Sequence, residues 1–152
     1  MEKNFNSIKN EIRSVIFGKR CTIIEPSNLY ECKLGDDVFV GPFVEIQKNV
    51  AVGDRSRISS HSFLCSKVII GKDCFIGHGV VFTNDKFKNF KINMEEKNLI
   101  PTNVGDNVLI GSNSTILPVK ICSGTIIGAG SVVTKDINIK GIYAGNPAKL
   151  LE

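Results

Sequence analysis

The sequence has few of the residues that build metal sites, disulfide frameworks or membrane spans. It contains two histidines and five cysteines, an odd number, with no Cys-x-x-Cys pair, so neither a metal centre nor a disulfide scaffold is expected. No run of about eighteen apolar residues is present, which argues against a transmembrane helix. The first residues lack the apolar stretch of a signal peptide, so we expect a cytoplasmic protein.

A strong charge of one sign is also missing. The formal net charge is +4 over 152 residues, which is too mild and too dispersed to indicate nucleic-acid binding. It favours small anionic ligands such as nucleotides. The length predicts one domain.

What the sequence does contain is an apolar residue at every sixth position. The consecutive anchors are Leu34, Val40, Ile46, Val52, Ile58, Leu64, Ile70, Ile76 and Phe82. The residue after the anchor is often glycine, and the residue four after it is small from Val38 to Val80. A period of six fits neither an α-helix nor a simple alternating strand and is typical of a hexapeptide-repeat β-helix.

Three hexads form one triangular coil, with a short parallel strand on each side and a turn at each corner. We expect an all-β parallel β-helix whose coils stack at about 4.8 Å. The anchor and the small residue should point inward, so Cys74, at a small position, should pack in the core. The glycine after the anchor is expected to serve the corner, where a positive φ is often needed.

The register breaks twice. After Phe82 the next anchor should fall at position 88 but lies at Val104, so 16 residues are inserted (104 − 88). A one-residue deletion follows between Ile116 and Ile121. The single domain then divides into a capping segment (1–20), coils (21–83), an inserted loop (84–103), coils (104–139) and a tail (140–152).

Both ends are expected to carry short helical segments. Apolar residues from Phe5 to Ile16 have helical spacing, which predicts a helix over about residues 6–15 covering the first coil. The alternative is a degenerate first hexad around Ile16. Residues Ala148 to Leu151 are expected to form a final helical turn or lid.

The inserted loop is the segment that the scaffold does not need, so it is the first candidate for function. Its apolar residues include Phe87, Phe90 and Met94. These side chains need a partner surface, and a neighbouring subunit is the natural one. We therefore expect the loop to help form a shared cleft.

The two histidines, His61 and His78, are 17 positions apart (78 − 61), one short of a full coil, so their backbones should lie on adjacent coils near one corner. His78 is at an outward position, where an imidazole could deprotonate an amine or hold a carbonyl oxygen. A surface or interface histidine bonded to a neighbour's backbone is the alternative for each.

Asn84 and Asp85 follow the last anchor and should leave the coil beside His78. An amide and a carboxylate together can hold an ammonium group or sugar hydroxyls. The alternative is turn chemistry, since Asn-Asp is a favoured turn pair.

The later coils could hold an elongated ligand. The turns at Gly111-Ser112-Asn113 and at Ala129 lack bulky side chains, so backbone N–H groups there can approach a ligand closely. Lys135 and Lys149 could meet its phosphates.

Residues 22–152 resemble the left-handed β-helix acyltransferases of the hexapeptide-repeat superfamily. The segments 127–136 (IGAGSVVTKD) and 143–149 (YAGNPAK) resemble the acetyl-coenzyme A end of that superfamily. Four further segments, 28–30, 41–47 (GPFVEIQ), 60–63 and 76–85, resemble the nucleotide-linked amino-sugar N-acetyltransferases.

The resemblance implies acetyl transfer from acetyl-CoA to the amine of a nucleotide-linked amino sugar, most readily a dTDP-3-amino-3,6-dideoxyhexose, in cell-surface glycan (lipopolysaccharide) biosynthesis. It also implies a homotrimer with active sites between subunits and no metal. The implied catalytic residues are His78, Asn84 and Asp85. The implied substrate-binding residues are His61, Ser66, Phe82, Asn84 and Asp85. The implied acetyl-CoA-binding residues are Gly111, Ser112, Ala129, Lys135, Pro147 and Lys149.

Other functions fit the residues less well. A γ-type carbonic anhydrase needs three zinc-binding histidines across an interface, and this chain has two. A purely structural or ice-binding solenoid would present flat arrays of outward threonines, whereas the outward positions here are mixed. An acetyltransferase for an amino acid, an antibiotic or another small amine or hydroxyl acceptor remains the main alternative.

Overall fold

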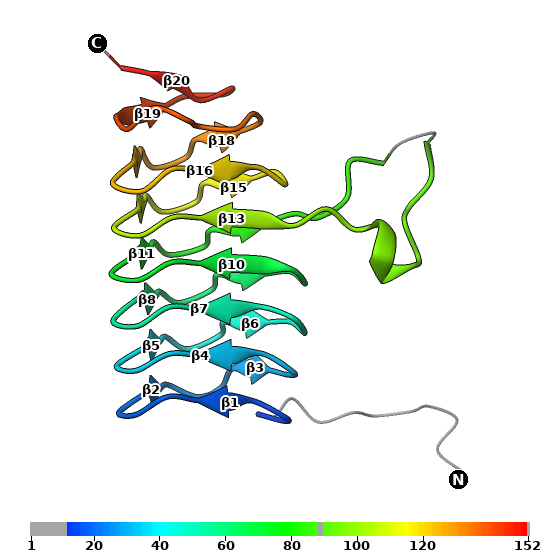
Figure 1. Cartoon of the computed structure of the whole chain (residues 1–152), viewed down its shortest axis with the longest axis vertical. Helices are drawn as coiled ribbons and strands as arrows, with labels where there is room; N and C mark the ends of the chain where they lie inside the picture. The colour runs from blue at the N-terminus through cyan, green and yellow to red at the C-terminus, as the bar shows by residue number, and fades with distance from the viewer. Residues whose placement is uncertain (1–11, 88–89, 152) are drawn as a thin grey trace, which may run out of the picture.

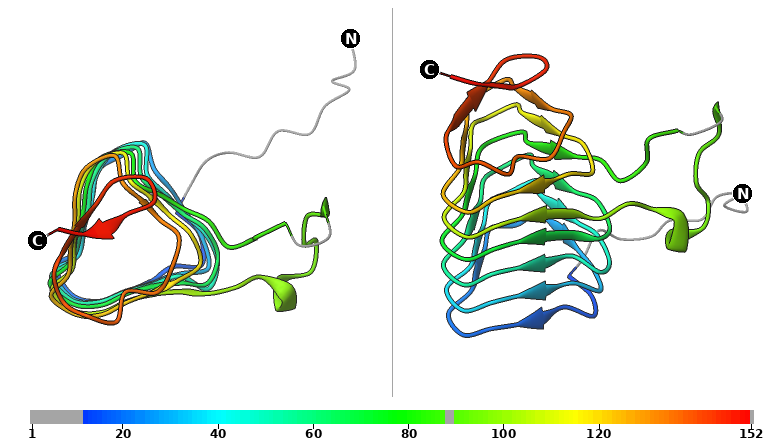
Figure 2. Two further views of the ribbon diagram at one scale, coloured as in Figure 1. Left: turned by 90° about the horizontal axis from the view of Figure 1, so that it is seen from above. Right: turned by 45° about the horizontal axis from the view of Figure 1, so that its top comes forward.

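The computed structural model describes residues 12–87 and 90–151 as a triangular prism of stacked coils. Three sheets form its faces, parallel throughout except for the last strand, β20, and the chain visits them in turn (Figures 1 and 2). The first sheet contains β1 (Ile16–Phe17), β4 (Lys33–Leu34), β7 (Ala51–Val52), β10 (Val68–Ile70), β13 (Thr102–Val104) and β16 (Lys120–Ile121). The second contains β2 (Thr22–Ile23), β5 (Phe39–Val40), β8 (Arg57–Ile58), β11 (Phe75–Ile76), β14 (Leu109–Ile110), β17 (Ile126–Ile127), β19 (Ile142–Ala144) and β20 (Lys149–Leu150). The third contains β3 (Asn28–Leu29), β6 (Glu45–Ile46), β9 (Phe63–Leu64), β12 (Val81–Phe82), β15 (Thr115–Ile116) and β18 (Val132–Val133).

Three corners connect these faces. We call the turns from the second to the third sheet the histidine corner (residues 41–44, 59–62, 77–80, 111–114 and 128–131). The loop corner runs from the third to the first sheet (47–50, 65–67, 83–101 and 117–119). The charged corner runs from the first to the second sheet (35–38, 53–56, 71–74, 105–108 and 122–125) and carries ion pairs such as Arg55–Asp73 at 2.7 Å.

The core is the column of anchors, and the predicted hexapeptide-repeat solenoid is confirmed. All nine anchors from Leu34 to Phe82 are buried, as are the small residues from Val38 to Val80. Cys74 is buried and unpaired, as predicted. Small polar residues fit inside because their hydroxyls bond to backbone carbonyls: Ser62 Oγ, for example, donates to Gly77 O at 2.8 Å.

The prediction for the glycines was wrong about their role. Left-handed backbone occurs two residues later, at positions such as Asp37, Phe43 and His61 (φ 58°, 59° and 62°). The glycine after the anchor is needed because the next coil lies against it. A Cβ on Gly41 would lie 2.8 Å from the backbone nitrogen of Ser60. Glycine therefore permits close stacking of the coils at this position.

The first coil begins earlier than expected. Residues 12–15 are not helical: Arg13 forms a parallel bridge with Tyr30, and β1 pairs with β4 through Ile16↔Lys33. The degenerate hexad around Ile16 is thus the correct alternative for this part, because its backbone groups pair with the next coil. The rest of the predicted helix, 6–11, lies outside the described residues.

Of the two forms expected for the C-terminal residues, the helical turn is wrong and the lid is correct. β19 and β20 form an antiparallel hairpin, with Tyr143 opposite Leu150. The connecting turn contains Gly145 at φ 100°, a conformation that suits glycine and reverses the chain. β20 lies across the end of the prism, where it is drawn in red (Figure 2).

The inserted loop runs from β12 to β13 and projects sideways from the prism (Figures 1 and 2). It contains the short 3-10 helix η2 (Glu96–Asn98) and ends where β13 begins, at Thr102. Lys67 Nζ donates to the carbonyl of Leu99 at 3.1 Å, and Lys48 pairs with Glu96 at 2.7 Å, so the coils hold the base of the loop. Among the described residues, no helix has the length and apolarity to span a bilayer.

Candidate functional site

His78 lies exposed at the histidine corner. The coil before it holds its imidazole, and the coil after it holds its backbone. Its Nδ1 is hydrogen-bonded to Ser60 Oγ at 2.8 Å. Its backbone N–H donates to Ser112 Oγ at 3.1 Å. Because Nδ1 is engaged, Nε2 is the ring nitrogen available to a ligand.

A shallow hollow of about 240 Å³ surrounds this imidazole. Phe39, Arg57 and Phe75 line it from three successive strands of the second sheet, in register with one another. The Arg57 guanidinium stacks 3.8 Å from the centroid of the Phe39 ring. The hollow therefore combines a base, a cation and two aromatic rings.

Sequence reasoning missed Arg57. It occupies an ordinary outward position of its hexad, and nothing local distinguishes it. The available signal was the 18-residue spacing of Phe39, Arg57 and Phe75 (57 − 39 and 75 − 57), which places the three side chains on one ladder of the sheet.

His61 lies on the coil next to His78 at the same corner, as predicted. The two rings nevertheless belong to different rows: the neighbour of His61 in the next coil is Gly79, whose N–H donates to the carbonyl of Ser60. The His61 ring stacks on Phe43 in the coil before it, with centroids 4.9 Å apart and planes 15° from parallel.

Asn84 and Asp85 form the floor of a second hollow, at the loop corner. Its volume is about 300 Å³, and Phe63, Val81 and Phe87 contribute apolar walls. The Asn84 amide donates to the carbonyl and to the hydroxyl of buried Ser66, both at 3.1 Å. Ser66, Asn84 and Asp85 therefore lie together. The predicted substrate contact of Phe82 was wrong, because its side chain is a fully buried core anchor.

Asp85 organises the loop. Its carboxylate accepts from the backbone N–H of Asn93 at 2.7 Å, from the Asn93 side chain at 2.7 Å and from the N–H of Phe87 at 2.9 Å. These bonds, the Asn93 backbone first, lower the pKa of Asp85 below its usual value. The turn role weighed for the Asn-Asp pair is therefore realised, and contact with substrate stays a prediction.

The expectation that Asn84 and Asp85 leave the coil beside His78 was wrong within one chain. His78 precedes β12 at the histidine corner, and Asn84 follows β12 at the loop corner, so one face of the prism separates them. They line different hollows. The reason is geometric, since six residues complete one side of the triangle.

Most of the predicted acetyl-CoA residues lie along the histidine corner above His78. A Cβ on Gly111 would meet the backbone nitrogen of Ala129, so these turns stack closely, and the Gly111 N–H already donates to the carbonyl of Ile127 at 2.8 Å. The turn containing Pro147 joins the same corner, because the N–H of Gly145 donates to Ser131 Oγ at 3.2 Å.

The two predicted lysines lie elsewhere. Lys149 is exposed on β20, and Lys135 is exposed after β18 on the side of the loop corner. Lys135 is therefore separated from the other predicted acetyl-CoA residues within one chain.

Two family models match the repeats of this chain. The model "Hexapeptide repeat of succinyl-transferase" matches residues 67–82 and 101–135, and "Bacterial transferase hexapeptide (six repeats)" matches 31–66. Together the two models cover more than half of the chain and leave out the inserted loop.

Curated relatives include the bifunctional protein GlmU of Listeria monocytogenes and of Listeria innocua. Each is 30% identical in an alignment of 137 positions that covers 84% of this chain and 30% of the relative. The chain thus spans about a third of the length of these relatives.

Solved structures share the fold at lower identity. A perosamine N-acetyltransferase mutant from Caulobacter crescentus, in complex with CoA and GDP-perosamine, superimposes with a TM-score of 0.76 at 23% identity, over 89% of this chain and 58% of that one. A hexapeptide-repeat acetyltransferase from Vibrio cholerae, complexed with acetyl-CoA, gives 0.64 at 21% identity, over 93% and 71%. The repeat, the triangular coil and the family models agree: the chain belongs to the hexapeptide-repeat transferases.

Proposed function

We propose that the protein transfers an acetyl group from acetyl-CoA to the amine of a nucleotide-linked amino sugar. The observation that carries this proposal is the His78 imidazole, held through Nδ1 by Ser60 in a hollow that also contains Arg57. A fixed base beside a cation suits an acceptor that carries both an amine and a phosphate.

In the proposed reaction the neutral amine attacks the thioester carbonyl of acetyl-CoA. When Nδ1–H donates to Ser60 Oγ, the lone pair of His78 lies on Nε2, which accepts the proton that the amine loses. The tetrahedral intermediate collapses with cleavage of the C–S bond, and the CoA thiolate takes the proton from Nε2. The products are the N-acetyl sugar and CoA.

The bound acetyl-CoA would follow the histidine corner. Gly111, Ser112 and Ala129 would border its pantetheine arm, with the turn containing Pro147 above them. Lys149 and Lys135 would meet its phosphates, and Lys135 would do so from another subunit because it lies on another corner.

The remaining predicted residues also require a second copy of the chain. Asn84, Asp85 and Ser66 lie one prism face away from His78, so the loop corner of one chain would meet the histidine corner of the next. The exposed loop residues Phe87 (61%), Met94 (83%) and Phe90 (104%) would then be covered by the neighbour. A homotrimer gives three such shared sites.

A CoA-release assay tests the proposal. Acetyl-CoA is supplied with dTDP- and UDP-linked amino sugars, and with free amino sugars and amino acids as the competing acceptor classes. We expect turnover with at least one nucleotide-linked sugar. Turnover only with a free amine or hydroxyl acceptor would favour the alternative acetyltransferase, and no turnover with any nucleotide-linked sugar would refute the proposal.

Variants test the site itself. Ser60→Ala removes the partner of Nδ1, and we expect kcat to fall about tenfold, whereas Ser123→Ala, an exposed serine on the charged corner, should match the wild type. Unchanged kinetics in Asn84→Ala would show that the loop corner is not part of the active site. The fold assignment would not be affected.

A further inference from the structure

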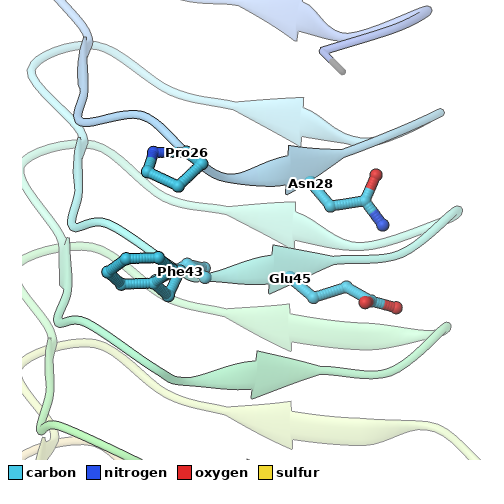
Figure 3. A pocket seen from close by; sticks show the side chains of 5 residues that line it. Pro26, Asn28, Phe43 and Glu45 are labelled. Atoms are coloured by element: carbon cyan, nitrogen blue, oxygen red, sulfur yellow. The ribbon is translucent and has the colours of Figure 1, made fainter. Parts of the chain in front are cut away.

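A third hollow, of about 320 Å³, lies on the other side of the turn that borders the His78 hollow. Pro42 lines the His78 hollow, and its neighbour Phe43 lines the third one, with Pro26, Asn28 and Glu45. Figure 3 shows the two ring-bearing residues at one end and the two polar side chains at the other. None of the contacts proposed for acetyl-CoA or for the reacting amine involves this hollow.

Phe43 is an unusual residue for its position. The residue is 57% exposed, and its backbone is left-handed. The same turn position of a later coil, two coils beyond His61, is occupied by Asn113 (φ 59°). Asparagine adopts this left-handed conformation more readily than phenylalanine does. The fold does not need an aromatic ring here. Backed by His61 at 4.9 Å, the ring forms a firm surface on which a planar ligand can stack.

The polar end of the hollow is preorganised. Asn28 and Glu45 are directly paired on β3 and β6. Gln47 Nε2 donates to Glu45 Oε1 at 2.9 Å, and Arg13 Nη1 donates to Asn28 Oδ1 at 3.2 Å. Within the described residues this leaves Glu45 Oε2 as an acceptor and the Asn28 amide N–H groups as donors. A ligand is therefore met by a strong acceptor beside a donor.

We propose that the Phe43–Glu45 hollow is a nucleobase subsite that binds the base of the acceptor; the inference rests on the proposed function. A base stacks on an aromatic side chain and is identified through hydrogen bonds to its pairing edge. A carboxylate there accepts from a ring N–H, which guanine, uracil and thymine carry. Adenine and cytosine can offer the carboxylate only an exocyclic amine N–H, which is a weaker donor than the acidic ring N–H.

The position relative to His78 suits a nucleotide-linked sugar. Phe43 lies two coils before His78 along the same corner, which is about 10 Å at 4.8 Å per coil. The two hollows flank one turn, residues 41–44. A base at Phe43 would thus place its diphosphate near Arg57 and its sugar amine near Nε2.

Free nucleoside diphosphates test the subsite by calorimetry. We expect GDP, UDP or dTDP to bind at least tenfold more tightly than ADP and CDP. Phe43→Asn, which keeps the left-handed turn, should weaken binding roughly tenfold or more because stacking is lost. Glu45→Gln should remove the discrimination between bases, and Glu31→Gln, an exposed glutamate in the turn between β3 and β4, should match the wild type.

Equal affinity for all five nucleotides, no measurable binding, or full affinity in both Phe43→Asn and Glu45→Gln would overturn the subsite. The outcome is separable from the proposed function. Selective binding without acetyl transfer would support the subsite and refute the reaction, whereas acetyl transfer to a nucleotide sugar with an unchanged KM in both variants would do the reverse.

Discussion

Substituting Gly77, the residue before His78, tests the stacking of the coils most directly. A Cβ at Gly77 would lie 2.6 Å from Ser112 N, 2.8 Å from Ile110 O and 2.9 Å from Gly111 C. All three are backbone atoms of the next coil, so no side-chain rotation relieves the overlap and the coils must separate. Overpacking costs about 1–3 kcal/mol, and we expect Gly77→Ala to destabilise the protein by about 3 kcal/mol, at the upper end.

The matched control is Gly130→Asn at the same corner. Gly130 has φ 67° and no atom within 4 Å of an added Cβ, and asparagine tolerates this conformation, so the cost should stay within about 1 kcal/mol. Thermal unfolding followed by circular dichroism measures both. At about 2–4 °C per kcal/mol for a chain of this size, Gly77→Ala should lower Tm by about 6–12 °C. Equal losses in the two variants would refute the stacking argument.

Three further predictions concern chemistry. His78→Gln should lower kcat by about 100-fold or more, the range for a general base, without changing Tm; a loss below tenfold in the CoA-release assay would exclude that role. The pKa of Asp85 is lowered in the folded protein, so its hydrogen bonds stabilise the loop above the unfolded pKa of 3.8 and are lost as pH falls through the folded pKa. Asp85→Asn should therefore speed tryptic cleavage of the loop at pH 7. Unchanged cleavage would contradict this. Burial raises the pKa of Cys65 to about 12, so iodoacetamide at pH 8 should alkylate the half-buried Cys21 and Cys122 before Cys65. Mass spectrometry of the native protein measures the order of alkylation. Earlier alkylation of Cys65 would contradict this prediction.

The fold could be read from the sequence because its signal is local and repeated. Each anchor from Leu34 to Phe82 reports one side of the triangle, and burial of the anchors follows from the period alone. The two ends were harder to predict. Ile12 and Val15 have helical spacing, but their segment pairs with the next coil, since backbone groups at the end of a solenoid gain more from the sheet than from an isolated turn.

The candidate site was predictable residue by residue but not as an arrangement. His78 could be identified as an outward imidazole, and Asn84 and Asp85 by the break in register. Their separation was not predicted, because nearness in sequence suggested nearness in space, whereas the turn at each corner redirects the chain by a full face.

The sequence by itself determined the hexad, the inward column and the place of the inserted loop, because a period of six encodes the strand, the turn and the side-chain direction in each repeat. Only the tertiary structure decided which side chains meet between coils. Ser60 with His78, Phe43 with His61, and Arg57 with Phe39 are each 18 positions apart, and a one-residue change in spacing moves a side chain to another row. Glycine after the anchor illustrates the same division: the sequence marks the position, and the closeness of the neighbouring coil explains why no larger residue fits there.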